Sequence, residues 1–331
     1  MTSAPETALK RAEELAERIL PDRRAKKKML VIVNPYATTV SDRLKNLVVY
    51  ALQGRYDVEA IDTKAQGHAT ELCHEAAEAG YDVVVAFGGD GTVNEVANGL
   101  VGTGTPLTCL PGGATNVFGR TLGIPNDVVD ATEHLLLMAD DFNPMRVDTG
   151  IVNGRHFVFA SGVGLDASVV ERVDAHPYRK ARFGEYYFTW AAISSFNKTY
   201  LVKPPRMNVE VNGETIEAVT AIVQNSDPFT FFGTRPIRVA KGAGLQTGTL
   251  GFAVLQRATL IDVPTLIPRL FTGRPESVTK HRRITGFDPV ESVTITSADG
   301  REFPMEADGD FLGNFERVEY GVAPASLAVV A

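Results

Sequence analysis

Three glycines and an aspartate stand together at Gly88–Gly91, directly after an apolar, β-branched run from Val83 to Phe87. The run suits a strand that is buried on both faces. Apolar residues then recur at helical spacing up to residue 100, and Thr92 with Glu95 fits a capping box at the start of that helix. A strand, a glycine turn and a helix N-terminus favour a bound anion, because open N–H groups and the helix dipole face it. The Asp90 carboxylate adds a group for a proton or Mg²⁺.

The same stretch also fits a tight connection that only caps its helix, and a glycine-rich turn alone is a weak signal. The chain has neither the G-x-x-x-x-G-K-[ST] pattern of a P-loop nor the G-x-G-x-x-G pattern of a dinucleotide-binding fold. The function of this turn must therefore be judged from the loops that lie beside it.

Strands alternate with helices from residue 28 onward. We expect strands at 29–33, 58–61, 83–87 and 106–110. We expect helices after Gly67 and Thr92, at about 115–122, and at 41–52 with Leu44, Leu47, Val48 and Ala51 facing inward. This alternation predicts a doubly wound, mostly parallel sheet, whose ligands sit at the carboxyl ends of the strands. Four polar or glycine-rich loops fall on that edge, at Asn34, Thr63, Gly88–Thr92 and Gly112–Asn116.

The pattern changes after about residue 145, where three hairpin-type dipeptides follow: Asn153-Gly154, Asn212-Gly213 and Asp299-Gly300. We expect a second, antiparallel unit built as a β-sandwich. Its hairpins would pair 146–152 with 156–160, 207–211 with 216–223, and 293–296 with 301–303. The closing segment 323–330 is a further strand that can return to the first sheet.

Two segments combine apolar and basic residues. Residues 6–20 have the apolar face of a helix and lead into a basic cluster at 23–28, which fits either contact with an anionic membrane or a solvated linker. A helical insert at about 166–198 carries seven aromatic residues beside Arg179, Lys180 and Arg182. It fits either an acyl-chain cleft with a headgroup rim or a helix packed on the sandwich.

Composition limits the function. The 331 residues are 44% hydrophobic and 22% charged, which is typical of a globular chain of two domains. The net charge of −7 argues against a nucleic-acid partner. The two cysteines, Cys73 and Cys109, provide no disulfide framework, which favours a reducing cytoplasm. No apolar run reaches the roughly 20 residues that span a bilayer. We expect a cytoplasmic protein, peripheral to the membrane, and a homodimer is one open alternative.

The motif GGDGTVNEV at Gly88–Val96 resembles the signature of the diacylglycerol kinase catalytic fold, which includes bacterial soluble lipid kinases and sphingosine kinases. Five further stretches are similar to that family and stand in its order: Asn34-Pro35, Thr63–Ala69, Leu110–Pro125, Arg146–Ala167 and Ala307–Asp310. The resemblance implies an ATP- and Mg²⁺-dependent kinase that phosphorylates a lipid hydroxyl, with diacylglycerol as the first candidate and phosphatidic acid as its product. The site would lie in the cleft between an α/β nucleotide-binding domain and a β-sandwich domain.

The order of the predicted strands and helices, together with the resemblance, implies the bounds of the domains. The resemblance also implies roles for individual residues. Residues 1–27 would be an N-terminal helix and linker, residues 28–145 with about 321–331 the nucleotide-binding domain, and residues 146–320 the lipid-substrate domain. Asp310 would accept the proton, with Asp308 as the aspartate of the same motif, and Asp90 would hold Mg²⁺. The nucleotide would be bound by Asn34, Pro35, Tyr36, Ala37, Thr38, Thr63, Gly88, Gly89, Asp90, Gly91, Thr92, Val93, Asn94, Glu95, Gly113, Ala114, Thr115 and Asn116.

Several positions depart from the family pattern, and three of them bear most directly on the predicted site. Ala37 stands where a serine is usual, Ala114 where a threonine is usual, and Asp310 where a glutamate is usual. These departures leave a non-catalytic nucleotide- or lipid-binding regulator as an alternative. An NAD kinase, which shares the GGDGT motif, is a second alternative, although the chain lacks the S-T-P-T-G-S-T-A-Y-like segment that such enzymes are expected to carry. The sequence does not decide between diacylglycerol and other lipids.

Overall fold

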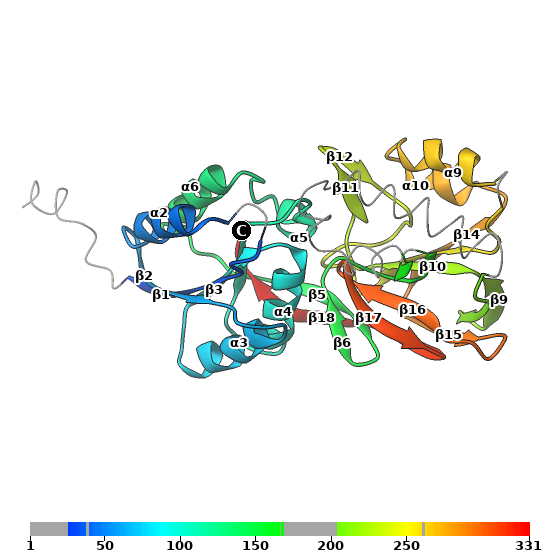
Figure 1. Cartoon of the computed structure of the whole chain (residues 1–331), viewed down its shortest axis with the longest axis horizontal. Helices are drawn as coiled ribbons and strands as arrows, with labels where there is room; N and C mark the ends of the chain where they lie inside the picture. The colour runs from blue at the N-terminus through cyan, green and yellow to red at the C-terminus, as the bar shows by residue number, and fades with distance from the viewer. Residues whose placement is uncertain (1–25, 38–39, 166, 169–203, 260–261) are drawn as a thin grey trace, which may run out of the picture.

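The computed structural model describes residues 26–37, 40–165, 167–168, 204–259 and 262–331 (Figure 1). The predicted N-terminal helix and most of the predicted helical insert lie outside these residues, and so does Thr38. Within the described residues, no helix is both long enough and apolar enough to cross a bilayer.

The first half of the chain forms the predicted parallel sheet. Its strands lie in the order β2-β1-β3-β4, and each pairs with its neighbours in parallel register. Their bounds are β1 (Lys27–Val33), β2 (Tyr56–Asp62), β3 (Val83–Gly88) and β4 (Leu107–Pro111). The strand order reverses between β1 and β3, and ligands of open α/β sheets bind in the crevice at such a reversal. The loops that follow β1 and β3 are therefore the ones to examine first.

Helices cover both faces of this sheet. α2 and α6 lie on one face, and α3 and α4 lie together on the other (Figure 1). The five helices of this half are α2 (Asp42–Leu52), α3 (His68–Glu78), α4 (Asp90–Leu100), α5 (Val117–Thr121) and α6 (Val128–Met138). The prediction that Leu47 faces inward is wrong, because its side chain is 58% exposed while Val48 and Leu52 are buried. The helix α6 has no counterpart among the predictions.

The sheet continues without interruption into the second half of the chain. β18 (Arg317–Val329) pairs with β4 in parallel and with β5 and β15 antiparallel. The remaining strands of this sheet are β5 (Met145–Val152), β6 (Arg155–Phe157), β8 (Met207–Val211), β9 (Glu214–Ala218) and β15 (Ser292–Ser297). The return of the last strand to the first sheet is thus confirmed, and this strand joins the two halves.

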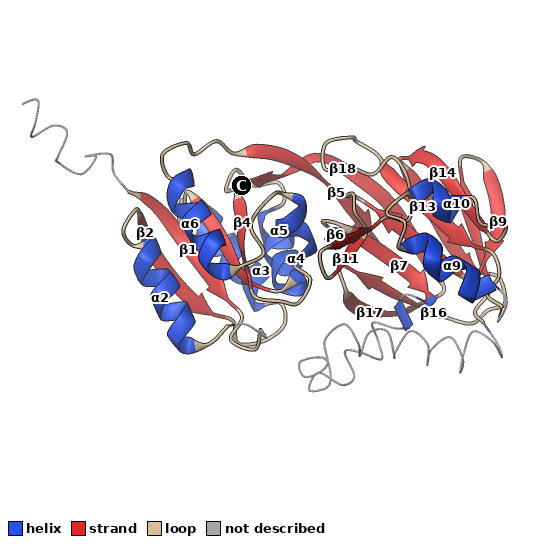
Figure 2. Cartoon of the chain, turned by 90° about the horizontal axis from the view of Figure 1, so that it is seen from above, coloured by secondary structure: helices blue, strands red, loops and turns tan. Residues whose placement is uncertain are grey.

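A second, antiparallel sheet packs on this extension. Its order is β14-β13-β10-β7-β16-β17, from β7 (Ala160–Gly164), β10 (Thr220–Gln224), β13 (Leu250–Leu255), β14 (Ile284–Val290), β16 (Phe303–Ala307) and β17 (Asp310–Phe315). Apolar side chains of both sheets, among them Phe157, Phe252 and Ile295, form one buried core. The predicted sandwich is therefore confirmed (Figure 2). Beside it lie the hairpin β11 (Thr230–Phe232) with β12 (Arg235–Ile237), and α9 (Asp262–Leu270) and α10 (Pro275–Thr279).

One of the predicted strand pairings is wrong, and another holds only in its first part. Asn153-Gly154 and Asn212-Gly213 do close hairpins, β5–β6 and β8–β9. The run 216–223, however, is broken at Val219 into β9 and β10, which belong to different sheets. Asp299-Gly300 closes no hairpin, because β15 pairs in the first sheet and β16 pairs in the second. Such a dipeptide fixes the shape of a turn but not the partner of the strand that follows it.

Candidate active site

The turn between β3 and α4 meets a second glycine turn after β4. An ideal Cβ added to Gly112 would lie 2.8 Å from Cα of Gly88, and one added to Gly113 would lie 2.8 Å from Cα of Gly89. The Gly112 N–H also donates to the Gly88 carbonyl at 2.8 Å. The two backbones touch, so only glycine fits at these positions. The contact holds both loops at the carboxyl edge of the sheet.

The helix α4 begins earlier than the capping box predicts. It starts at Asp90, and Gly89 is its N-cap with an extended backbone. Thr92 Oγ1 accepts a hydrogen bond from Asn34 Nδ2 at 3.2 Å, and Glu95 Oε2 accepts one from the Ala69 N–H at 3.3 Å. The predicted capping box is therefore wrong. Its two side chains instead bind the loop after β1 and the start of α3.

The loop after β1 lies against this turn. The Asn34 N–H donates to the Phe87 carbonyl at 3.0 Å, and Asn34 Oδ1 accepts from the Tyr36 N–H at 3.0 Å. Pro35 and Tyr36 are exposed, and the Tyr36 side chain is 87% exposed. The Thr63 N–H donates to the carbonyl of the last residue of β1 at 2.8 Å. The described residues of this loop, and Thr63 directly after β2, thus lie at the same edge as the glycine turn.

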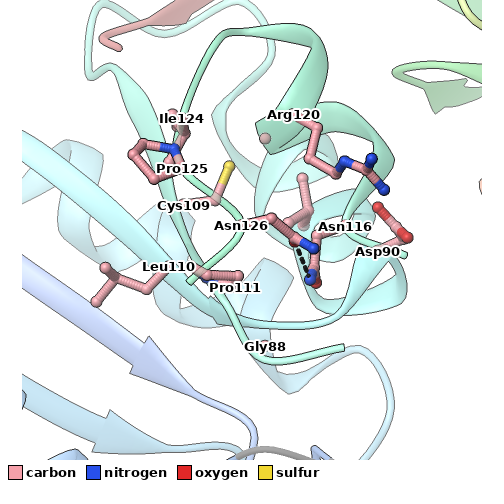
Figure 3. Close-up of a pocket in the computed structure, with 12 residues that line it drawn as sticks. Gly88, Asp90, Cys109, Leu110, Pro111, Asn116, Arg120, Ile124, Pro125 and Asn126 are labelled. Carbon is pink, nitrogen blue, oxygen red and sulfur yellow. Dashed lines mark hydrogen bonds between the residues drawn. The ribbon is translucent and has the colours of Figure 1, made fainter. Parts of the chain in front are cut away.

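Asn116 and Asp90 organise the loop after β4. Asn116 has a left-handed backbone (φ 49°) and exchanges two hydrogen bonds of 2.9 Å with the Gly113 backbone. Asp90 Oδ1 accepts from the Val117 N–H at 2.7 Å, which ties α4 to α5. Ala114 is exposed and Thr115 is half-buried. The sequence analysis gave no role to Arg120 or Asn126. Both nevertheless line one small pocket together with Asp90 and Asn116 (Figure 3).

Asp308 is buried at the junction of the two halves. Its Oδ2 accepts from the Val158 N–H and from Asn94 Nδ2, both at 2.7 Å, and its Oδ1 accepts from the N–H groups of Phe159 (2.9 Å) and Ala160 (3.2 Å). Asp308 is 1% exposed and Asn94 is 0% exposed. This carboxylate therefore holds α4 of the first half to the segment before β7 of the second.

Asp310 lies against the first turn of α4. An ideal Cβ added to Gly91 would lie 2.8 Å and 2.9 Å from the two carboxylate oxygens of Asp310. The turn that presents this carboxylate has left-handed backbone at Asp308 (φ 50°) and Gly309 (φ 81°), and Glu306 Oε2 accepts from the Gly309 N–H at 2.9 Å. A carboxylate from the second half of the chain thus lies next to the glycine turn of the first.

The three carboxylates shape the electrostatics of the site. The pKa of Asp90 is raised to about 7, mainly by burial and to a smaller extent by the nearby carboxylates of Asp308 and Asp310, while the hydrogen bond from the Val117 N–H opposes the rise. Burial also raises the pKa of Asp308 to about 6, which its backbone donors and Asn94 oppose. Among the described residues, no group of three or more His, Cys, Asp or Glu side chains is arranged to hold a metal ion. A cation at this site would need ligands from outside the protein, such as phosphate oxygens.

Family comparisons cover nearly all of the described chain. Residues 28–147 match the diacylglycerol kinase catalytic domain, and residues 160–331 match the YegS C-terminal NAD kinase beta sandwich-like domain. An uncharacterized protein of Synechocystis is 27% identical over 322 residues, which cover 91% of this chain and 69% of that protein. A protein of Staphylococcus aureus named diacylglycerol kinase is 25% identical over 296 residues, 87% of each chain.

A solved structure gives the same result. The crystal structure of a candidate diacylglycerol kinase from Bacillus anthracis str. Sterne superposes with a TM-score of 0.70. It is 25% identical in sequence, and the match covers 93% of this chain and 98% of that one. The mixed sheet and the sandwich described above are therefore the architecture of that protein as well.

Proposed function

This chain belongs to the diacylglycerol kinase catalytic-domain family and carries that family's YegS-type C-terminal β-sandwich, and from this premise we propose that it transfers the γ-phosphoryl group of ATP to a lipid hydroxyl. Diacylglycerol is the first candidate acceptor, because two relatives of about one-quarter identity are named diacylglycerol kinase. The single observation that carries the proposal is the position of the Asp310 carboxylate against the N-terminal turn of α4.

The turn between β3 and α4 supplies what a triphosphate needs. The first N–H groups of a helix have no partner inside the helix, and the helix dipole adds positive potential there. A Cβ at Gly88 would lie 2.4 Å from Thr92 Oγ1, so the main chain stays bare where a phosphate would approach. Asn34 and Asn116 brace the loops on either side. We assign the nucleotide phosphates to this turn.

Asp310 and Asp308 take different roles in this proposal. Phosphoryl transfer depends on alignment and charge neutralisation more than on covalent catalysis. Asp310, beside the phosphate turn, accepts the hydroxyl proton as the lipid oxygen attacks phosphorus, a contribution of about 10²–10⁴-fold. Asp308 accepts four hydrogen bonds and is buried, so it positions the turn that carries Asp310 rather than touching the substrate.

Asp90 is the residue that would hold Mg²⁺. Mg²⁺ commonly binds one or two carboxylates together with substrate phosphates, and when bound it neutralises phosphate charge. A second carboxylate, Asp310, lies close enough to raise the pKa of Asp90, and such a crowded acidic site fits a divalent cation. Asp90 also keeps its hydrogen bond with the Val117 N–H, so its carboxylate is held in one orientation.

The domain assignment follows from these roles. We propose that residues 28–145 with about 321–331 bind the nucleotide and that residues 146–320 bind the lipid. Of residues 1–27 only the last two are described, and we give them no role. Because the acceptor is a membrane lipid, we propose that the protein works peripherally at the cytoplasmic face of a membrane.

The test is a transfer assay with purified protein and ATP labelled at the γ-phosphate. The acceptors are diacylglycerol, phosphatidylglycerol, ceramide, sphingosine and NAD, each with and without Mg²⁺. We expect label in a lipid, only with Mg²⁺, and loss of turnover in Asp310→Asn without loss of nucleotide affinity. Label in NAD alone would favour the NAD kinase alternative. Nucleotide binding without transfer to any acceptor would instead point to a non-catalytic regulator.

A further inference from the structure

An exposed apolar surface lies beside the candidate active site. The β11–β12 hairpin stands next to α5, and α9 and α10 follow along the same edge of the molecule (Figure 1, Figure 2). Three side chains on it are exposed although they are large and apolar: Phe232 (42%), Ile267 (47%) and Phe271 (42%). We call these three, together with Arg235 and Arg274, the hairpin–α9 surface.

Two of the exposed side chains, Ile267 on α9 and Phe271 directly after it, form one stripe along the helix. Leu266 and Leu270, four residues apart, pack on a small buried core around Val278. Ile267 and Phe271 are also four residues apart and lie on the neighbouring stripe, which faces outward. The ring of Phe232 meets the ring of Phe271 edge to face, with 5.3 Å between centroids. The helix thus has two apolar stripes, and the described residues of the protein pack against only one of them.

The hairpin fixes this surface relative to the candidate active site. The Arg120 guanidinium lies 3.5 Å from the ring centroid of Phe231, and Arg120 also lines the pocket with Asp90. Adjacent residues of a strand point to opposite faces, so Phe232 points away from Arg120. Arg238 Nη1 donates to the Gly273 carbonyl at 3.3 Å, which joins the hairpin to the turn after α9. A partner that binds this surface would therefore be held at a fixed distance from the candidate active site.

Basic side chains flank the apolar ones. Arg235 is directly opposite Phe232 in the hairpin, so the two side chains share one side of it. Arg274 follows Phe271 by three residues, and both arginines are exposed. Neither of them forms a salt bridge with any residue that the structure describes. The stretch 262–283 holds five Lys or Arg residues against two acidic ones, within a chain of net charge −7.

We propose that the hairpin–α9 surface docks the protein on an anionic lipid bilayer. Aromatic and aliphatic side chains enter the headgroup boundary, and arginines beside them bind anionic headgroups. Local positive charge on an acidic protein selects an anionic partner. The inference rests on the proposed function, since a kinase of membrane lipids must bring its site to the bilayer. Docking here would place the pocket lined by Arg120 close to the lipid surface.

The test is co-sedimentation of the full chain with vesicles of phosphatidylcholine alone or mixed with phosphatidylglycerol. One variant carries Phe232→Ser and Phe271→Ser, and a second carries Arg235→Gln and Arg274→Gln. We expect the second to weaken binding to anionic vesicles about fivefold for each arginine removed, and the first to weaken binding to both vesicles. The control Leu137→Ser removes a side chain that is 66% exposed on α6 and should bind as the parent does.

Two results would overturn the proposal. Both double variants could bind anionic vesicles as the parent does. Alternatively, the serine variant could change the sedimentation of a dimer to that of a monomer with vesicle binding intact, which would make the surface a contact between two copies. A transfer assay separates this inference from the proposed function. Loss of activity on vesicles, with full activity on a dispersed short-chain diacylglycerol, supports docking. Parent protein that binds vesicles through these residues but phosphorylates nothing supports docking and refutes the kinase proposal.

Discussion

The substitution Gly91→Ala tests whether Asp310 works at the start of α4. The added Cβ would lie 2.8 Å from the nearest carboxylate oxygen, whereas ordinary contact begins at 3.4 Å. The obstacle is the end of a flexible side chain, so the carboxylate retreats by about 0.6 Å and the backbone stays in place. A misplacement of about 1 Å costs about 10²-fold in rate. We therefore expect kcat to fall by about 10- to 100-fold.

Stability should not follow the rate. Alanine is favoured over glycine within a helix by about 0.5–1 kcal/mol, so the melting temperature of Gly91→Ala should stay the same or rise. The matched control is Gly104→Ala, because a Cβ there meets nothing within 4 Å and its φ is not positive. The assay compares kcat for ATP and diacylglycerol, nucleotide affinity and thermal unfolding for the parent and both variants.

A double-mutant cycle decides whether the effect passes through Asp310. If it does, Gly91→Ala should add little to the loss already caused by Asp310→Asn, since the displaced group is gone. Full additivity of the two losses, or parental kcat in Gly91→Ala, would refute the reasoning. Full additivity would mean that Gly91→Ala lowers kcat through the turn between β3 and α4 and not through Asp310. Parental kcat would mean that the Asp310 carboxylate is not needed at this point.

Three further predictions concern the junction of the two halves, the core of the sandwich and the Asp90 carboxylate. Asp308→Asn should lower the free energy of unfolding by about 3 kcal/mol in a urea titration, because an amide cannot accept all four hydrogen bonds; Asp310→Asn should leave it nearly unchanged. Gly150→Ala should cost about 3 kcal/mol or prevent folding, because its Cβ would lie 2.0 Å from the buried ring of Phe157; thermal unfolding and soluble yield measure this. Since the pKa of Asp90 is raised from 3.8 to about 7, the folded chain holds that proton more tightly than the unfolded chain and loses stability as pH rises between these values; Asp90→Asn should flatten that part of the stability–pH curve, and an unchanged slope would contradict the assignment.

Local sequence patterns predicted the parallel half of the fold well. The run before Gly88 is apolar on both faces because β3 lies between β1 and β4 with helices above and below, and each of its residues is buried. The glycine loops were predictable for a related reason. Residues without Cβ are required where two main chains touch, and the sequence shows such residues directly. Burial and close approach leave a trace at the residue itself.

Contacts between residues that are far apart in the sequence could not be predicted in this way. Asp308 is bound by backbone N–H groups about 150 residues away, and any residue type except proline could supply them. Glu95 fits a capping box by its spacing, but its carboxylate binds the Ala69 N–H because α3 and α4 pack side by side. For the same reason the dipeptide at Asp299-Gly300 could not reveal that the chain changes sheets there. These features depend on tertiary contacts, which a local pattern does not encode.

The junction explains how two lobes can share one site without a separate hinge. β18 belongs to the sheet of the first half through β4 and to the sandwich through β15, so the backbone hydrogen bonds run from one half into the other. The buried pair Asn94–Asp308 adds a second attachment on the side of α4, and Arg155 completes it by donating to Asn94 Oδ1 at 2.6 Å. Two attachments on different elements resist rotation about either one. The distance between the Asp310 carboxylate and the turn between β3 and α4 is therefore set by the folded chain itself, as the role proposed for Asp310 requires.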